Sequence, residues 1–250
     1  NKIKSIPELS IQRFDFNNRK YPFNNIHFRK AINYAFDKER FIKERLKGRS
    51  IKAEGIFPPS SEVYNPDLKG YKFDLEMART ELAKSGVKLP LKIKITISES
   101  ETNIKNAEFI KECLEKIGIE CYLEIKPWKE FLEAIHLDRT ETHLIGWIAD
   151  TGDPDSIVYP LFHSSSVKSG ANEMKYSNPL VDKLLEEARK IRIPDERKKL
   201  YQEIEKKVLE DAPCIFLYHP YERVLLSDKV LGIWPHPLGH FRLEIVFKFP

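Results

Sequence analysis

No stretch of this 250-residue sequence approaches the roughly 20 consecutive apolar residues that a membrane-spanning helix requires. Like charges never gather in long blocks, because the 42 basic and 38 acidic residues are mixed along the chain. A net charge of +4 distributed in this way gives no sign of a surface for nucleic acid or for a membrane. We therefore expect no nucleic-acid partner.

Cysteine is scarce, and the usual catalytic and cofactor motifs are missing. Cys113, Cys121 and Cys214 are odd in number and form no C-x-x-C pair, so we expect buried thiols rather than a zinc site or a disulfide framework. The sequence contains no G-x-G-x-x-G, no phosphate-binding loop, no G-x-S-x-G and no H-E-x-x-H. His236 and His240 are the closest histidine pair, but prolines interrupt that segment and no carboxylate or cysteine stands directly beside them. We expect no metal centre and no cofactor.

What is present is the composition of an ordinary globular protein, with 41% hydrophobic and 32% charged residues and a mean hydropathy of −0.46. This length suits one large domain or two small ones. The first residues, 1–4, include neither an initiator methionine nor the core of a signal peptide. We therefore expect a chain that has been processed, trimmed or taken from a longer protein.

Apolar periodicity divides the chain into strands and helices. The predicted strands are 9–17, 91–97, 119–125, 143–149, 214–218 and 223–226, and the predicted helices are 27–46, 75–85, 103–116, 128–137, 178–191 and 194–211. From residue 91 onward, strands alternate with helices, which predicts parallel strands joined by right-handed crossovers. The fold class that this pattern indicates is α/β.

The most informative segment follows the predicted strand 143–149. Ligands of α/β proteins bind at the carboxyl ends of strands, and here Trp147 and Asp150 occupy such an end. An aromatic face beside a carboxylate suits an organic ligand that carries a positive charge. The run 153–155 (Asp-Pro-Asp) is instead typical of a helix N-terminus, with a cap, an early proline and favourable charge. Trp147 and Asp150 are therefore the first functional candidates.

A second interpretation of the same segment stays open. Asp150, Asp153 and Asp155 form a carboxylate cluster that an α/β hydrolase-type enzyme could use. That chemistry needs two carboxylates about 5–10 Å apart across a bound sugar, and sequence spacing does not establish such a separation.

Several segments, in order along nearly the whole chain, carry a likeness to a known family. They are FRKAINYAFDKE (28–39), FDLEMARTELAKSG (73–86), WIADTGDPDSIVYPLF (147–162), YSNPLVDKLL (176–185) and APCIFLYH (212–219). In these segments the chain resembles the C-terminal half of the family 5 extracellular solute-binding proteins. These are the oligopeptide, dipeptide and nickel-binding receptors of ABC importers.

The resemblance implies one lobe of a two-lobed receptor that closes over a solute like a hinged clamp. The implied fold is a periplasmic-binding-protein-like (type II) lobe, with a mixed, mainly parallel sheet flanked by helices. Residues 1–20 would be a crossing strand from the first lobe, 21–215 the second lobe, and 216–250 a return segment. We also expect an exposed face where the first lobe would sit.

The resemblance further implies a set of ligand contacts. Asp150 matches the acid that pairs with the amino terminus of a peptide, a charge-assisted bond. The backbone of Gly146 and Ile148 would bond an extended ligand as a neighbouring strand does. The remaining implied contacts are Trp147, Trp128, Thr151, Tyr218 and His219. For Trp128, a role in core packing remains equally open.

One departure from the family pattern leaves the ligand open. Oligopeptide receptors often place an arginine three residues before the tryptophan to hold the ligand carboxylate, but this position is Leu144. The nearest basic residues are His136, Arg139 and His143, so the solute could be a peptide, a metal chelate, a sugar or haem. The resemblance implies a binding protein and not an enzyme. It implies a monomer that is periplasmic or extracytoplasmic, with or without a lipid anchor, and that delivers its solute to membrane permease subunits. A sensory or regulatory module that reuses the lobe is a further alternative.

Overall fold

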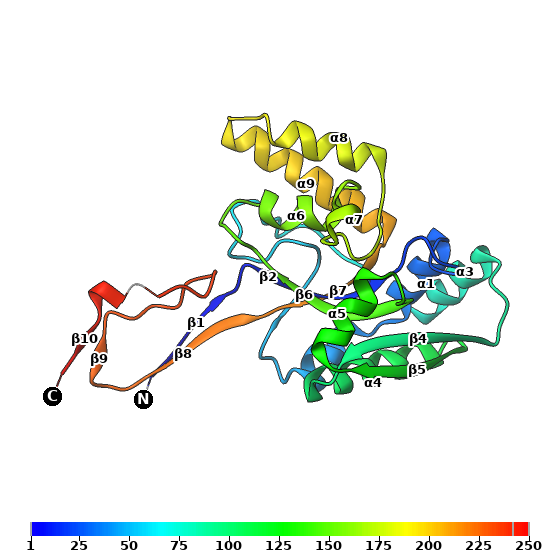
Figure 1. Ribbon diagram of the computed structural model, residues 1–250, viewed down its shortest axis with the longest axis horizontal. Coiled ribbons are helices and arrows are strands. Elements are labelled where there is room, and N and C mark those ends of the chain that lie inside the picture. Colours follow the sequence, from blue (N-terminus) through cyan, green and yellow to red (C-terminus); the bar gives the residue numbers. More distant parts are fainter. Residues whose placement is uncertain (1, 242, 250) are drawn as a thin grey trace.

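The computed structural model describes residues 2–241 and 243–249 (Figure 1). Its centre is a sheet of six strands: β2 (Ser10–Phe16), β3 (Ile51–Lys52), β4 (Leu91–Ser98), β5 (Ile119–Lys126), β6 (Thr142–Ile148) and β7 (Cys214–His219). Their spatial order is β3-β7-β2-β6-β4-β5. The predicted α/β class with a mixed sheet is confirmed. The sheet is parallel only where β4 meets β5 and β6, because β2 runs antiparallel to both of its neighbours and β3 runs antiparallel to β7.

Helices flank this sheet on both faces (Figure 1). They are α1 (Ile26–Ala35), α2 (Lys38–Arg40), α3 (Leu75–Ser85), α4 (Glu101–Glu115), α5 (Trp128–His136), α6 (Asp155–Phe162), α7 (Ser166–Ser169), α8 (Pro179–Ala188) and α9 (Pro194–Asp211). A π-helical turn spans Phe41–Arg45 and a 3-10 turn spans Leu243–Ile245. None of the helices in the described ranges has the length and apolar character needed to cross a membrane.

Alternation along β2 explains why both faces of the sheet are covered. Phe14 and Phe16 are buried in a core shared with α1, α3 and α4. Leu9, just before the strand, and Ile11 point to the other face and are buried in a second core with α6, α8 and α9. Since successive strand residues point to opposite faces, a strand that is apolar on both must be packed on both.

The predicted helix at 27–46 is wrong as a single element, because the chain breaks after Ala35. Phe36 is extended (φ −84°, ψ 114°), and the Asp37 side chain accepts a hydrogen bond from the Arg40 backbone N–H to begin a new short helix. Phe36 and Phe41 are both fully buried, with their ring centroids 5.3 Å apart. The break lets both rings enter the same core.

Other local predictions are confirmed. Asp74 begins α3 by accepting hydrogen bonds from the backbone N–H groups of Glu76 and Met77, and Gly86 ends the helix in the left-handed region at φ 67°. The three cysteines are free and buried, as their number and spacing indicated.

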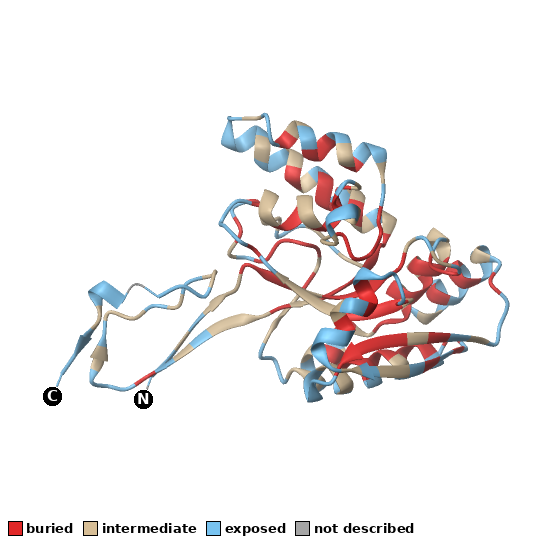
Figure 2. Ribbon diagram, viewed as in Figure 1, coloured by how far each residue is buried: buried red, intermediate tan, exposed pale blue. Residues whose placement is uncertain are grey.

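A two-stranded ribbon leaves the body of the molecule (Figure 1). It pairs β1 (Lys2–Pro7) antiparallel with β8 (Tyr221–Leu226), and β9 (Val230–Leu231) and β10 (Phe247–Lys248) form a second small pair. Figure 2 shows that this part is mostly exposed or intermediate, whereas buried residues fill the body. Large apolar side chains are among the exposed ones, including Ile3 (71%), Leu225 (68%), Trp234 (69%) and Phe247 (66%).

The strands next to the two ends of the ribbon lie within the central sheet. The expected boundaries lay at residues 20 and 215, but β2 and β7 each have a neighbouring strand on both sides within the central sheet. The segment before Leu9 and most of the segment from Tyr221 onward leave the body, but the Pro237 carbonyl accepts a hydrogen bond from the Leu9 N–H and Leu238 packs against the second core.

One buried acid from α9 holds the loop after β3. Glu205 is 2% exposed, and its Oε1 accepts hydrogen bonds from the backbone N–H groups of Ile56 (2.7 Å) and Phe57 (3.0 Å). Burial raises the pKa of Glu205 to about 7, although these two bonds favour the charged form.

We expect Glu205→Gln to stabilise the protein at pH 8 and to leave stability nearly unchanged at pH 4. Because the folded-state pKa is raised, the native protein keeps a proton that the unfolded chain loses near pH 4.5, so this contribution is lost as pH rises toward 7. The expected gain is of order 3 kcal/mol of unfolding free energy. Urea unfolding of both proteins at pH 4, 6 and 8 measures it. An identical pH dependence in the two proteins would contradict the assignment.

Candidate functional site

Three strands end at one edge of the central sheet. β6 is parallel to β4, and β7 runs in the same direction because both β6 and β7 are antiparallel to β2. The candidates Gly146 and Ile148 lie in the last part of β6, and Asp150 and Thr151 follow it. The structure therefore puts them where ligands of α/β sheets bind.

The last part of β6 has one unpaired edge. The Ala149 N–H donates to the Leu9 carbonyl at 2.8 Å, and the Asn17 N–H donates to the Glu141 carbonyl at 2.9 Å. The backbone N–H and C=O groups of the odd-numbered residues of β6 therefore point toward β2. The backbone groups of the even-numbered residues point toward β4, but among the described residues β4 pairs with β6 only at Thr142 and His143. The backbone groups of Gly146 and Ile148 thus have no strand partner among the described residues. We call these groups the open edge of β6.

Trp147 and Asp150 lie in different surroundings at this strand end. The indole of Trp147 is half-buried against the second core, and its Nε1 donates to the Ser156 carbonyl at 3.0 Å. Asp150 is exposed, and no hydrogen bond or ion pair joins its carboxylate to the described part of the chain. Thr151 shapes the turn, since its Oγ1 accepts from the Asp153 N–H at 3.2 Å.

Asp153 and Asp155 are held by arginines from the following helices. Arg197 donates to both oxygens of Asp153 at 2.8 and 2.9 Å, and Arg189 donates to Asp155 at 2.8 to 3.0 Å. Burial by itself would raise the pKa of Asp153, but the hydrogen bonds from Arg197 outweigh burial and lower that pKa. These acids fasten α6 to α8 and α9 instead of facing each other across a cleft, so the cluster expected for a hydrolase is not assembled.

The remaining candidates belong to other elements than the Asp150 loop. Trp128 begins α5, is 55% exposed and lies 5.6 Å from the ring of Phe131. Tyr218 is half-buried in the first core, 6.1 Å from the ring of Phe41. His219 is buried, its Nδ1 donates to the Ser10 carbonyl at 2.8 Å, and burial lowers its pKa to about 4.

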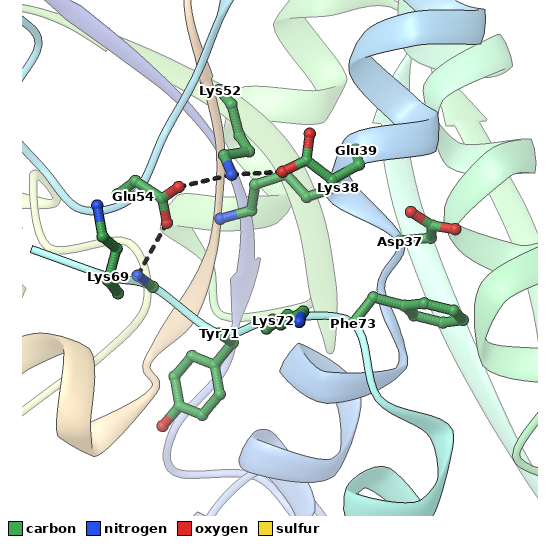
Figure 3. A pocket seen from close by; sticks show the side chains of 10 residues that line it. Asp37, Lys38, Glu39, Lys52, Glu54, Lys69, Tyr71, Lys72 and Phe73 are labelled. Atoms are coloured by element: carbon green, nitrogen blue, oxygen red, sulfur yellow. Dashed lines mark hydrogen bonds and ion pairs between the residues drawn. The ribbon is translucent and has the colours of Figure 1, made fainter.

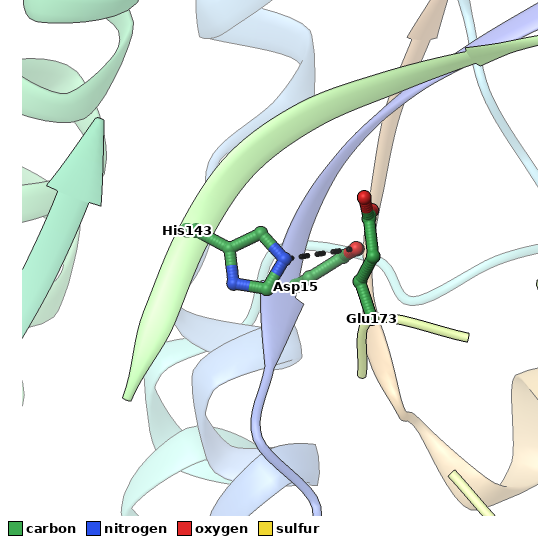
Figure 4. A group of neighbouring side chains, drawn as sticks. All are labelled: Asp15, His143 and Glu173. Atoms are coloured by element: carbon green, nitrogen blue, oxygen red, sulfur yellow. Dashed lines mark ion pairs between the residues drawn. The ribbon is translucent and has the colours of Figure 1, made fainter. Parts of the chain in front are cut away.

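Sequence reasoning did not find a buried charged cluster that joins β2 to β6 (Figure 4). Arg13 donates to both oxygens of Asp15 at 3.0 and 2.9 Å and approaches Glu173 Oε2 at 3.4 Å, while His143 Nε2 lies 3.6 Å from Asp15 Oδ2. Burial alone would raise the pKa of Asp15, but Arg13 lowers it, whereas burial raises the pKa of Glu173. The signal in the sequence was two charged residues, 13 and 15, on an inward face of a predicted strand.

The same cluster has the donor atoms of a metal site. Ligand atoms of Asp15, His143 and Glu173 lie within 4.8 Å of one another. However, the Arg13 guanidinium contacts the two carboxylates that a cation would need, and it already supplies the compensating positive charge. The arrangement is that of an internal ion-pair network that ties together three distant parts of the chain.

Pockets also form on the described part of the chain. One of about 430 Å³ lies between α2, β3 and residues 69–73 (Figure 3). Its charges pair internally, because Lys52 contacts both Glu39 and Glu54. Lys38 is buried and donates to the Ala53 carbonyl at 2.6 Å, and burial lowers its pKa to about 8.

The comparison with protein families adds the deciding observation. The model of the bacterial extracellular solute-binding proteins, family 5, matches residues 1–169. The chain belongs to this family. The sequence resemblance is thereby confirmed, and so is the implied α/β lobe with a mixed sheet flanked by helices. The expectation that this sheet is mainly parallel was wrong, because antiparallel pairs outnumber parallel ones in it.

Two relatives of this family 5 chain have names that refer to different ligands. It is 31% identical over 242 residues to the probable di/tripeptide-binding protein 5 of Pseudomonas aeruginosa (strain UCBPP-PA14), covering 95% of this chain and 46% of the relative. It is also 31% identical over 237 residues to heme-binding protein A of Haemophilus influenzae, covering 93% and 43%. The chain thus spans about half the length of these curated relatives.

Solved structures agree with the family 5 fold. The chain matches a dipeptide binding protein from Pseudoalteromonas sp. SM9913 in complex with Met-Leu, with a TM-score of 0.88, 28% identity, and coverage of 99% of this chain and 50% of that one. It matches the periplasmic binding protein DppA from Helicobacter pylori in complex with the peptide STSA, with a TM-score of 0.88, 30% identity, and coverage of 98% and 49%.

Proposed function

We propose that this chain is the second lobe of a two-lobed receptor that captures peptides for an ABC importer. The observation that carries the proposal is the open edge of β6 followed by the exposed, unpaired carboxylate of Asp150. A peptide in extended conformation presents N–H and C=O groups that pair with such an edge, and its terminal ammonium suits a free carboxylate. The ligand would run beside Gly146 and Ile148 and end at Asp150.

This mode of binding explains how a receptor accepts many peptides. Backbone pairing at the open edge depends on the peptide main chain, so side chains of the ligand are free to vary. Trp147 would contribute an apolar face beside the ligand, and Trp128, exposed at the start of α5, would contribute another. No covalent step is needed, so we propose a binding protein and not an enzyme.

The exposed apolar side chains of the ribbon support the proposal that another lobe packs against it. Ile3 and Leu225 lie directly opposite each other in the β1–β8 pair, and both are about 70% exposed. Large exposed apolar side chains usually mark a surface that another part of a protein covers. We propose that a first lobe covers this ribbon, and that the complete receptor works as an extracytoplasmic monomer that delivers its solute to membrane permease subunits.

Calorimetry with the two-lobed protein tests the proposal. We expect free dipeptides and tripeptides to bind, and the same peptides with an acetylated amino terminus to bind at least tenfold more weakly. A peptide amidated at its carboxyl end, which keeps the ammonium, is the matched control and should lose less. The 250-residue chain alone should bind poorly, because one wall leaves most of the ligand solvated. Equal affinity for free and acetylated peptides, or binding of haem in place of peptides, would contradict the assignment.

A further inference from the structure

A basic pocket lies where the ribbon joins the body, at the same sheet edge as the ends of β4 and β7. It has a volume of about 370 Å³ and is lined by residues of three separate segments: the turn after the π-helix, the start of α4 and the start of β8. Its charged side chains are Arg45, Lys47, Arg49, Lys105, Arg223 and Glu101. We call this site the junction pocket.

The junction pocket has an unusual imbalance of charge. Five cationic side chains line it against one carboxylate, whereas four lysines and three carboxylates line the pocket beside α2. The one acid, Glu101, is itself bound by Lys105. The pocket thus concentrates positive charge on a chain whose overall excess is only +4.

Most cations of this pocket have no ion pair within the described part of the protein, although the hydrogen bond from Lys105 and the nearby charge of Arg45 both help to lower the pKa of the Glu101 carboxyl. No ion pair joins Arg45, Lys47, Arg49 or Arg223 to a carboxylate there. Arg45 donates from Nη2 to the Asn106 side-chain oxygen at 3.1 Å, and its Nε is buried with no hydrogen-bond partner. Arg223 donates to the backbone carbonyl of Arg49. Both guanidinium groups are thus held in place by neutral acceptors.

We propose that the junction pocket binds an oxyanion, a carboxylate or phosphate group of a small molecule. Guanidinium groups bind carboxylate and phosphate through paired, charge-assisted hydrogen bonds, and Arg45, Arg49 and Arg223 all line this pocket. The volume suits a small anion. Nucleic acid is a poor fit, because acidic and basic residues are mixed along the chain and the overall excess is only +4.

Occupation of this pocket would also fix the ribbon to the body. Arg223 lies on β8, which belongs to the ribbon, whereas Arg45 and Lys105 lie on the helical layer of the body. An anion bound between them bridges two parts that are otherwise joined here by single hydrogen bonds such as the one from Arg223 to Arg49. Binding is therefore expected to raise the thermal stability of the chain, by an amount that grows with the logarithm of the ligand concentration above Kd.

The test is a calorimetric titration of the full chain with inorganic phosphate at 0.15 M salt. We expect saturable binding, and an affinity at least tenfold lower in the double variant Arg45→Gln/Arg223→Gln. Lys105→Gln should lower it less, because that lysine shares its charge with Glu101. The control is Arg192→Gln, an exposed arginine outside the pocket, which should leave the affinity unchanged.

A second measurement keeps the result independent of folding defects. Arg45→Lys keeps a positive charge but loses the paired geometry, so it should bind more tightly than Arg45→Gln at the same melting temperature. Titration with N-acetyl-dialanine and with its amide separates a carboxylate source from free phosphate, since only the acid carries an oxyanion. Absence of saturable binding by both phosphate and the acid, or an equal loss of affinity in Arg192→Gln, overturns the proposal.

Discussion

Replacing Asp150 by asparagine is expected to weaken the binding of free dipeptides to the two-lobed receptor about 50-fold. The carboxylate is exposed and unpaired in this lobe, so its charge is available to a ligand ammonium, and closure of the two lobes would remove that pair from water. A hydrogen bond to a charged group is worth about 1.5–3 kcal/mol, which corresponds to a factor of this size in affinity. Calorimetry with one defined dipeptide measures the loss.

Two controls separate the charge of Asp150 from the shape of its loop. Asp153→Asn weakens the ion pair with Arg197 in the same loop, so it should reduce stability slightly and leave peptide affinity nearly unchanged. An N-acetylated peptide lacks the ammonium and should bind Asp150→Asn and the parent protein equally. If Asp150→Asn binds free dipeptides as tightly as the parent does, the ammonium is held elsewhere.

Replacing Arg13 by methionine should destabilise the protein by about 3–5 kcal/mol. Arg13 and Asp15 are fully buried, and the guanidinium bonds both oxygens of that carboxylate while also facing Glu173. Methionine fills much of the same volume but leaves the carboxylates without their cation. The unfolding free energy from urea or guanidinium titrations measures the effect.

Companion variants show whether charge is the cause. Adding Asp15→Asn to Arg13→Met removes the fully buried charge of Asp15 and should recover more than half of the loss. Arg79→Met, which removes an exposed ion pair with Glu76, should cost less than about 1 kcal/mol. A loss in Arg13→Met as small as the loss in Arg79→Met would show that the buried network contributes little to stability.

Local patterns predicted much of the fold. The strand 91–97, the caps at Asp74 and Gly86 and the long helix 194–211 agree with the structure, because alternation, helical spacing and capping act between neighbouring residues. The helix predicted at 27–46 was wrong, because burial of both Phe36 and Phe41 in one core outweighed a continuous helical pattern. That competition depends on contacts far along the chain.

For the candidate site too, local patterns indicated positions along the chain but not long-range contacts. Asp150 follows a strand and precedes a helix, so its position at the sheet edge could be inferred from neighbouring residues. His219 was expected near a ligand, but it is buried against the Ser10 carbonyl, a contact between residues 209 positions apart. No local pattern carries such information.

The sequence by itself determined the alternation of strands and helices, the resemblance to family 5 and the position of an acid, Asp150, soon after β6. Only the tertiary structure decided that β4 stops pairing at His143, so that the open edge of β6 exists, and that Arg45, Lys105 and Arg223 surround one pocket. The physical reason is that hydrogen-bond partners across a sheet and charges from separate segments are brought together by packing. Their neighbours in sequence do not specify those contacts.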